Sequence, residues 1–131
     1  MSEKLFALRK IGGSMSETVL WTNPNQTGNF GATTITLSES VNNFKYIKVV
    51  FRFSTQTNNQ NYVIFPLDMW INSTATNGKN RCVIASYASN IFARGIAYAS
   101  ATSVTIGACY QVNQTGSGNN YVIPVEVIGL K

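Results

Sequence analysis

The clearest pattern in the sequence is a period of two along residues 45–54, KYIKVVFRFS. An extended chain points alternate side chains to opposite faces, so this segment is predicted to be a strand. One face would be buried and the other mostly wet, as in an antiparallel sheet with solvent on one side. The predicted buried face consists of Ile47, Val49, Phe51 and Phe53, and the opposite face of Lys48, Val50, Arg52 and Ser54.

Seven further segments have the same strand character, and Asn, Gly, Ser and Thr fill the loops between them. Short strands separated by turn residues indicate a sandwich or a barrel. For 131 residues, we expect one all-β domain, an antiparallel β-sandwich (jelly-roll-like) of about eight strands. The other predicted strands are 17–22, 33–38, 61–65, 80–88, 91–99, 102–112 and 121–128.

The first sixteen residues differ from the rest of the chain. Leu5, Phe6 and Leu8 precede Arg9, and a Gly-Gly-Ser sequence then follows. We expect residues 1–16 to be an N-terminal arm or connector and residues 17–131 to be the sandwich domain. Cloning-derived residues and a subunit-contacting arm are alternatives that the sequence leaves open.

The composition leaves few groups for catalysis. The chain has no His and five acidic residues, so most hydrolytic and metal-dependent mechanisms lack functional groups. Asp68 and Glu126 are the acidic residues with apolar flanks, as a glycosidase pair would need. Glu126 alternates with apolar residues and is more simply an outward carboxylate on a strand. We therefore expect no enzymatic activity, no catalytic residues, no metal and no cofactor.

The basic residues and the cysteines also fit a binding or structural protein. The net charge is +5, but Lys45, Lys48 and Arg52 are the nearest approach to a basic stripe, so we expect no nucleic-acid partner. No apolar segment is long enough to cross a membrane, and no signal peptide is evident, so synthesis in a cytoplasm is expected. Cys82 and Cys109 are predicted to be buried thiols, with a disulfide as the alternative.

Asn and Gln residues gather in loops near aromatic residues. Aromatic rings stack on the C–H faces of sugars, and amide groups supply planar hydrogen bonds. A saccharide-binding surface is one prediction; the alternative is that the Asn residues form turns and Trp70 lies in the core. The candidate ligand-binding residues are Gln56, Asn58, Asn59, Asn61, Tyr62, Trp70, Asn72, Gln114, Asn119, Asn120 and Tyr121.

Strand 91–99 gives a hint of oligomerisation. Small residues, Ala93, Gly95 and Ala97, share one face with Ile91, opposite a face of larger side chains. A small-residue face suits close packing against another sheet or subunit. Burial between the two sheets of one chain is the alternative.

Two stretches resemble C-terminal domains of phage and prophage tail-fibre or receptor-binding proteins from Gram-positive hosts. In that family a strand of the type LW-x-N-P and a loop ending in Phe precede T-I-x-L and Y-x-x-I-x-V strands. The corresponding segments here are Leu20–Pro24, Phe30, Thr34–Leu37 and Tyr46–Val49. The ending NNYVIPVEVIGLK, residues 119–131, resembles the last strand of the same domains. Residues 54–118 match nothing in the family.

The resemblance implies a non-enzymatic receptor-binding head that trimerises at the tip of a fibre. It would bind a host-surface saccharide or protein, contact other virion fibre or tail subunits, and be located in the virion after synthesis in the host cytoplasm. No binding residue carries over, because the family match omits the middle loops. A structural capsid, head-fibre or decoration protein and a monomeric bacterial carbohydrate-binding module are the alternatives.

Overall fold

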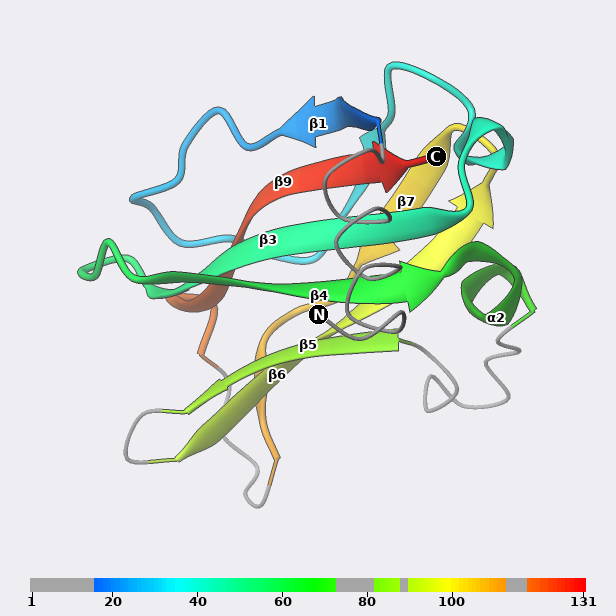
Figure 1. Cartoon of the computed structure of the whole chain (residues 1–131). Coiled ribbons are helices and arrows are strands. Elements are labelled where there is room, and N and C mark those ends of the chain that lie inside the picture. The colour runs from blue at the N-terminus through cyan, green and yellow to red at the C-terminus, as the bar shows by residue number, and fades with distance from the viewer. Residues whose placement is uncertain (1–15, 73–81, 88–89, 113–117) are drawn as a thin grey trace, which may run out of the picture.

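A computed structural model describes residues 16–72, 82–87, 90–112 and 118–131 as two antiparallel sheets packed face to face (Figure 1). The prediction of an all-β sandwich is confirmed. Most of the predicted arm, residues 1–15, lies outside the described residues. The described strands are β1 (Glu17–Thr22), β2 (Thr33–Thr36), β3 (Tyr46–Ser54), β4 (Gln60–Pro66), β5 (Cys82–Tyr87), β6 (Ile91–Ser100), β7 (Ser103–Ile106), β8 (Tyr110–Gln111) and β9 (Tyr121–Leu130).

Sheet A has the order β1-β9-β3-β4, and sheet B has the order β2-β7-β6-β5 with β8 also paired to β6. In sheet A, Val49 of β3 lies between Val63 of β4 and Val127 of β9. The last strand of the chain is therefore an inner strand of its sheet, between β1 and β3.

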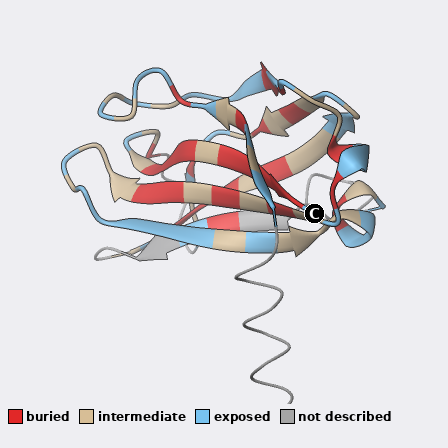
Figure 2. Ribbon diagram, turned by 45° about the horizontal axis from the view of Figure 1, so that its top comes forward, coloured by how far each residue is buried: buried red, intermediate tan, exposed pale blue. Residues whose placement is uncertain are grey.

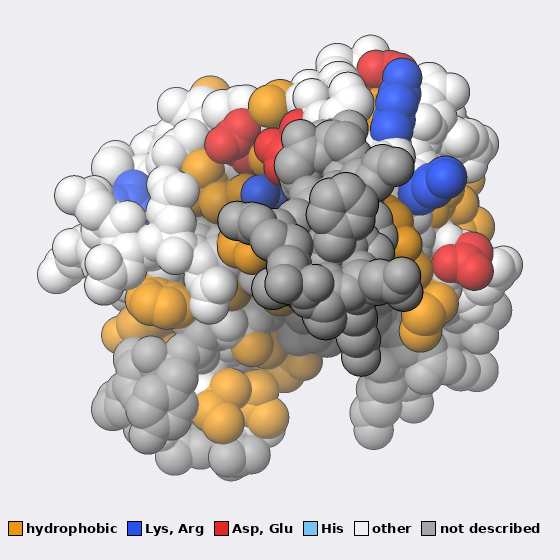
Figure 3. Space-filling model, viewed as in Figure 1, with side chains coloured by type: hydrophobic (Ala, Val, Ile, Leu, Met, Phe, Trp, Pro, Cys, Tyr) orange, Lys and Arg blue, Asp and Glu red, His pale blue; other side chains and the backbone are white. Residues whose placement is uncertain are grey.

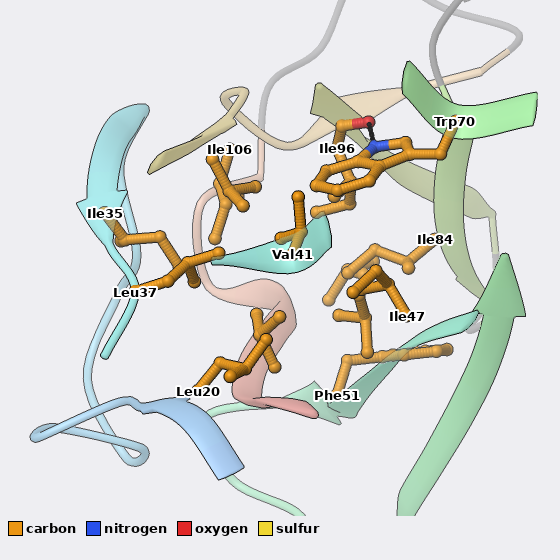
Figure 4. Close-up of a cluster of buried hydrophobic side chains, with 14 of the residues drawn as sticks. Leu20, Ile35, Leu37, Val41, Ile47, Phe51, Trp70, Ile84, Ile96 and Ile106 are labelled. Atoms are coloured by element: carbon orange, nitrogen blue, oxygen red, sulfur yellow. Dashed lines mark hydrogen bonds between the residues drawn. The ribbon is translucent and has the colours of Figure 1, made fainter. Parts of the chain in front are cut away.

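The core lies between the two sheets, where buried residues line the inner faces of the strands (Figure 2). Ile47 and Phe51 of β3 lie beside Ile84 of sheet B, and Ile96 and Ile106 belong to the same buried cluster (Figure 4). Each such side chain contributes about 1.5–3 kcal/mol on burial. The alternation that predicted β3 is thus the alternation between core and outer surface.

The described residues also include two short helical segments, η1 (Val41–Asn43) and α2 (Leu67–Ile71). The α2 helix inserts Trp70 into the core, where its indole Nε1 donates a hydrogen bond to the carbonyl of Ile96 at 3.0 Å (Figure 4). In the described part of the chain, no helix is long and apolar enough to cross a membrane.

Two details of the predicted strands are wrong. Segment 102–112 is interrupted between β7 and β8, because Gly107 turns its N–H to the carbonyl of Gly95 and its own carbonyl to Arg94. Arg52, predicted on the wet face of β3, is only 5% exposed. A bulge between Val50 and Phe51 shifts the register against β9, and the Arg52 side chain bonds to loops instead.

Candidate functional site

Three polar loops meet at one end of the sandwich, which we call the loop end. They are residues 22–32 after β1, residues 54–60 between β3 and β4, and residues 118–121 before β9. The N–H of Phe30 donates to the carbonyl of Asn119 at 2.9 Å, and the N–H of Thr55 donates to the carbonyl of Asn120 at 3.1 Å. The α2 helix lies at the opposite end of β3 and β4, which we call the helix end (Figure 1).

Arg52 holds two of these loops together. Its Nε donates to the carbonyl of Thr57 at 2.8 Å, and its Nη1 to the carbonyl of Gln26 at 2.9 Å. Its Nη2 donates to the carbonyl of Thr57 and, at 2.7 Å, to Oδ1 of Asn58. Loop 54–60 is therefore fixed to β3 and to loop 22–32 by one buried cation.

Arg94 does the same for the third loop. It is fully buried, and its guanidinium donates to the carbonyls of Val122 (2.7 Å), Asn119 (2.9 Å), Tyr121 (3.1 Å) and Gly107 (3.1 Å). Burial lowers the pKa of Arg94 to about 10, with a small opposing effect of Cys109. A pKa of about 10 leaves Arg94 charged near neutral pH, so it acts as a cation surrounded by backbone carbonyls.

Val122 shows what Arg94 holds in place. Its φ angle is 48°, in the left-handed region that a β-branched residue rarely adopts. Its carbonyl accepts the shortest hydrogen bond from Arg94. The hydrogen bond from the Arg94 guanidinium therefore helps to hold the strained backbone at the start of β9.

Cys109 lies beside this group as a free, buried thiol. Burial raises its pKa, which Arg94 and a backbone hydrogen bond partly oppose. A raised pKa keeps the thiol protonated, so Cys109 is a poor nucleophile. The prediction of a buried reduced thiol is confirmed for Cys109, whereas the Cys82 side chain lies outside the described residues.

The outer face of sheet A carries an open hollow of about 360 Å³ next to the loop end. That volume is within the usual range for small-molecule sites, about 300–1,000 Å³. Figure 3 looks onto this side, where acidic and basic side chains lie among apolar ones. The lining residues are Glu17, Lys48, Val50, Gln60, Asn61, Tyr62, Glu126 and Ile128.

Tyr62 is the aromatic side chain of this hollow. It is 55% exposed. The Nζ of Lys48 lies 4.7 Å from the centre of its ring and 3.5 Å from Oε1 of Glu17. Lys48 therefore makes a cation–π contact with one face of the Tyr62 ring.

Polar groups surround Tyr62 without closing the hollow. Gln60 and Asn61 precede it on β4, and Glu126 lies one strand beyond Val50, to which both Tyr62 and Glu126 are paired. A ring, two amides and a carboxylate thus line the hollow, and Oδ1 of Asn61 accepts from the N–H of Tyr62 at 2.8 Å. Such a set can stack against a sugar and hydrogen-bond to its hydroxyls.

The structure brings most of the predicted ligand-binding residues to the loop end. Asn61 and Tyr62 line the hollow, and Asn59 is exposed on the adjacent loop. Gln114 lies outside the described residues. The others at this end are Gln56, Asn58, Asn119, Asn120 and Tyr121.

Three of these loop-end residues have structural partners. Oδ1 of Asn58 accepts from Arg52, and Oδ1 of Asn119 accepts from the N–H of Cys109 at 3.2 Å. The ring of Tyr121 stacks on Phe92 with 4.0 Å between centroids. These contacts shape the loop end, and they leave Gln56, Asn59 and Asn120 as its exposed amides.

Trp70 and Asn72 are at the helix end, away from the other candidates. Trp70 is fully buried, so its prediction as a ligand-stacking residue is wrong and the alternative, a core residue, is right. Asn72 is exposed, but its amide donates to the carbonyl of Asp68 at 2.8 Å, where it ends α2.

The sequence prediction missed Gln60, Lys48 and Glu17 as neighbours of Tyr62. The period of two did place Lys48 outward on β3, and Glu126, predicted as an outward carboxylate, does line the outer hollow. The pairing of β4 with β3 and of β1 with β9, which unites these residues, was not evident from the pattern.

The acidic residues do not form the pair considered for a glycosidase. Asp68 lines a separate hollow of about 330 Å³ at the helix end, together with Lys45 and Tyr46. Glu126 lines the hollow near the loop end. Among the residues that the structure describes, no group of three or more potential metal ligands occurs.

Fold and site together define an all-β sandwich with braced polar loops and a polar, aromatic hollow on one sheet. No protein-family model matches the chain, and no curated protein matches it.

Proposed function

We propose that this protein is a non-enzymatic receptor-binding head of the phage-fibre type, which binds a host-surface glycan at the hollow around Tyr62. The observation that carries the proposal is the combination of exposed Tyr62 with Gln60, Asn61 and Glu126 in one hollow of ligand size. The virion is the proposed location, as the resemblance of residues 17–53 to fibre heads implies.

The loop end supports this function because hydrogen bonds within the protein hold its loops together. Arg52 and Arg94 bond to the backbone of all three loops. Fixing a binding surface in advance lowers the ordering cost of association. Polar groups on such loops can select a ligand without rearranging.

Single sites of this kind bind weakly, so the proposal includes a homotrimer. Linked copies raise the apparent affinity without new contacts. Ile91, Tyr110 and Val112 are exposed on sheet B, away from the hollow. This second surface is available for contact between subunits.

The experiment is binding of the purified protein to intact Gram-positive cells and to a glycan array. Tyr62→Ala should weaken binding about fivefold per site, because a stacked ring contributes roughly 1 kcal/mol. Asn61→Ala should also weaken binding. Met69→Ala is the matched control, since Met69 is exposed on α2 at the helix end. Binding that both Tyr62→Ala and Asn61→Ala leave intact would contradict the proposed site.

A structural capsid or decoration protein is the second candidate. The exposed apolar patch of Ile91, Tyr110 and Val112 favours it, since such patches commonly mark protein contacts. Failure to bind any glycan or cell, combined with stable trimers, would favour this candidate. A monomer that binds glycans would instead favour a carbohydrate-binding module.

A further inference from the structure

The hollow around Tyr62 is built across three neighbouring strands of sheet A. Val50 of β3 pairs with Tyr62 of β4 on one side and with Glu126 of β9 on the other. Directly paired residues point to the same face of a sheet, and all three side chains line the hollow. Because neighbouring strands are about 4.8 Å apart, the backbones of Tyr62 and Glu126 are separated by roughly 10 Å. Val50 is thus the floor between an aromatic wall and a carboxylate wall.

The described residues that line this hollow have more negative than positive charge. Lys48 is their cation, and its Nζ lies 3.5 Å from Oε1 of Glu17 and 4.7 Å from the centre of the Tyr62 ring. Glu17 and Glu126 are their two carboxylates. Two carboxylates against one ammonium group leave the lining with a formal charge of −1, whereas the whole chain carries +5. The hollow is therefore an acidic site on a basic protein.

Glu126 is the carboxylate that remains for a ligand. Among the residues that the structure describes, the ion pair of the hollow joins Lys48 to Glu17 and not to Glu126. Glu126 is partly buried, and the apolar residues Val50 and Ile128 line the hollow beside it. Such surroundings strengthen the attraction between a carboxylate and a bound cation relative to open water. A positively charged group on the ligand therefore fits this wall best.

The other groups of the hollow specify the rest of the ligand. The Tyr62 ring can stack on the C–H face of a sugar, and the side-chain amide of Gln60 can donate to and accept from hydroxyl groups. An amino sugar presents a C–H face, hydroxyl groups and an ammonium group on one rigid ring. A lysine side chain, in contrast, presents its ammonium group on a flexible stem without hydroxyl groups. The set of groups in the hollow therefore favours an amino sugar over a basic peptide.

We propose that the glycan bound at this hollow carries a free amine, whose ammonium group pairs with Glu126 while the sugar ring stacks on Tyr62. This inference rests on the proposed function, because it names the class of glycan for the same site. The charge of the hollow also disfavours sugars with a carboxylate or a phosphate group, which Glu126 would repel.

The test compares two probes of equal length, the tetramer of glucosamine and the tetramer of N-acetylglucosamine, by calorimetric titration of the purified full chain. Acetylation removes the positive charge of each amine. At low salt the glucosamine tetramer should bind about fivefold more tightly, which corresponds to an exposed ion pair of about 1 kcal/mol. Most of this preference should disappear near 1 M salt. The net charge of +5 repels a cationic probe, so attraction to the protein as a whole cannot produce the preference.

A charge-removing variant assigns the preference to one side chain. Glu126→Gln keeps the size of the side chain and removes its charge, so it should bring the two affinities to within about twofold of each other. Glu39→Gln is the matched control, because it changes the net charge by the same amount. Glu39 lies between β2 and η1 and does not line the hollow, so this variant should keep the fivefold preference.

The outcomes separate this inference from the proposed function. Equal binding of the two tetramers by the wild type overturns the amine preference and leaves the glycan site intact. A preference that persists in Glu126→Gln also overturns it, because the ammonium group would then bind elsewhere. A Gly-Lys-Gly peptide that binds as tightly as the glucosamine tetramer overturns the choice of a sugar. If neither tetramer binds at millimolar concentration, the inference fails, and the cell-binding test with Tyr62→Ala decides the proposed function separately.

Discussion

Arg94 is a buried cation whose described hydrogen bonds all go to backbone carbonyls. A guanidinium can serve several such acceptors at once because its five N–H groups form a rigid planar fork. The side chain also lies 5.4 Å from the ring centre of Phe30 in loop 22–32. Arg94 therefore ties sheet B to the start of β9 and to two loops of the loop end.

We expect Arg94→Met to lower the free energy of unfolding by about 3–5 kcal/mol, because the carbonyls of Gly107, Asn119, Tyr121 and Val122 would lose a donor. That is a large part of the stability of an ordinary domain, about 5–15 kcal/mol. Denaturant unfolding measures it, with Lys45→Met as the exposed control. A loss below about 1 kcal/mol would show that water replaces the guanidinium easily.

Trp70 shows the limit of sequence reasoning for a single residue. A Trp with apolar neighbours beside an Asn-rich loop has the same local pattern whether it faces the core or a sugar. Its place was decided by the short helix α2, which turns the indole towards Ile96. Tyr62, in contrast, was predicted as a candidate ligand-binding residue, and the structure leaves its side chain exposed next to a polar loop.

At the level of elements, β3 was predictable because one of its faces is buried and the other is mostly not. The predicted bounds of β3 and β9 agree with the structure to within two residues at either end, although β9 is buried at nearly every position. The break in 102–112 was not predictable, because its cause is Arg94 and Gly95 on the neighbouring strand. Likewise, a pattern within one strand carries no information about the strand that will lie beside it.

The same reasoning explains which candidate residues came together. β3 runs towards the loop end and β4 returns, so Asn58 and Asn59 lie at one end and Asn72 at the other. The antiparallel direction of β4 follows from the short loop that joins it to β3, so this part of the arrangement could have been predicted from the sequence. The position of loop 22–32 beside loop 118–121 depends on the pairing of β1 with β9. These strands are about a hundred residues apart, so their pairing could not be predicted from the sequence.

The hairpin between β3 and β4 provides a prediction at this scale. Arg52→Gln removes the donors that hold the carbonyls of Thr57 and Gln26. Amide hydrogen exchange should become faster across residues 55–59, while the core of β3 stays protected. If the hollow binds a glycan, affinity should fall severalfold, because Gln60 and Asn61 follow this loop directly. Lys45→Gln, at an exposed lysine just before the same strand, is the matched control, and unchanged exchange in Arg52→Gln would contradict the bracing role.

For the whole molecule, the outer face of sheet B is where subunits of the proposed trimer would meet. Ile91 and Val112 lie opposite each other, since the N–H of Val112 donates to the carbonyl of Ile91 at 2.9 Å. Ala93 pairs with Tyr110 on the same face. The small residues Gly95 and Ala97 continue it along β6, so another subunit can approach closely.

Tyr110→Glu tests this surface, because a carboxylate in the middle of an apolar contact would lose its water without gaining a partner. Light scattering after size exclusion should give the wild type three times the chain mass of 14.3 kDa, and the variant the mass of one chain. Met69→Glu adds the same charge at another exposed apolar residue and should leave the trimer intact. Binding of Tyr110→Glu to whole cells should fall much more than its affinity for a soluble glycan. The variant loses the avidity of three linked sites, whereas the hollow of each subunit is unchanged. A wild type that is monomeric at micromolar concentration would contradict both the trimer and the avidity argument.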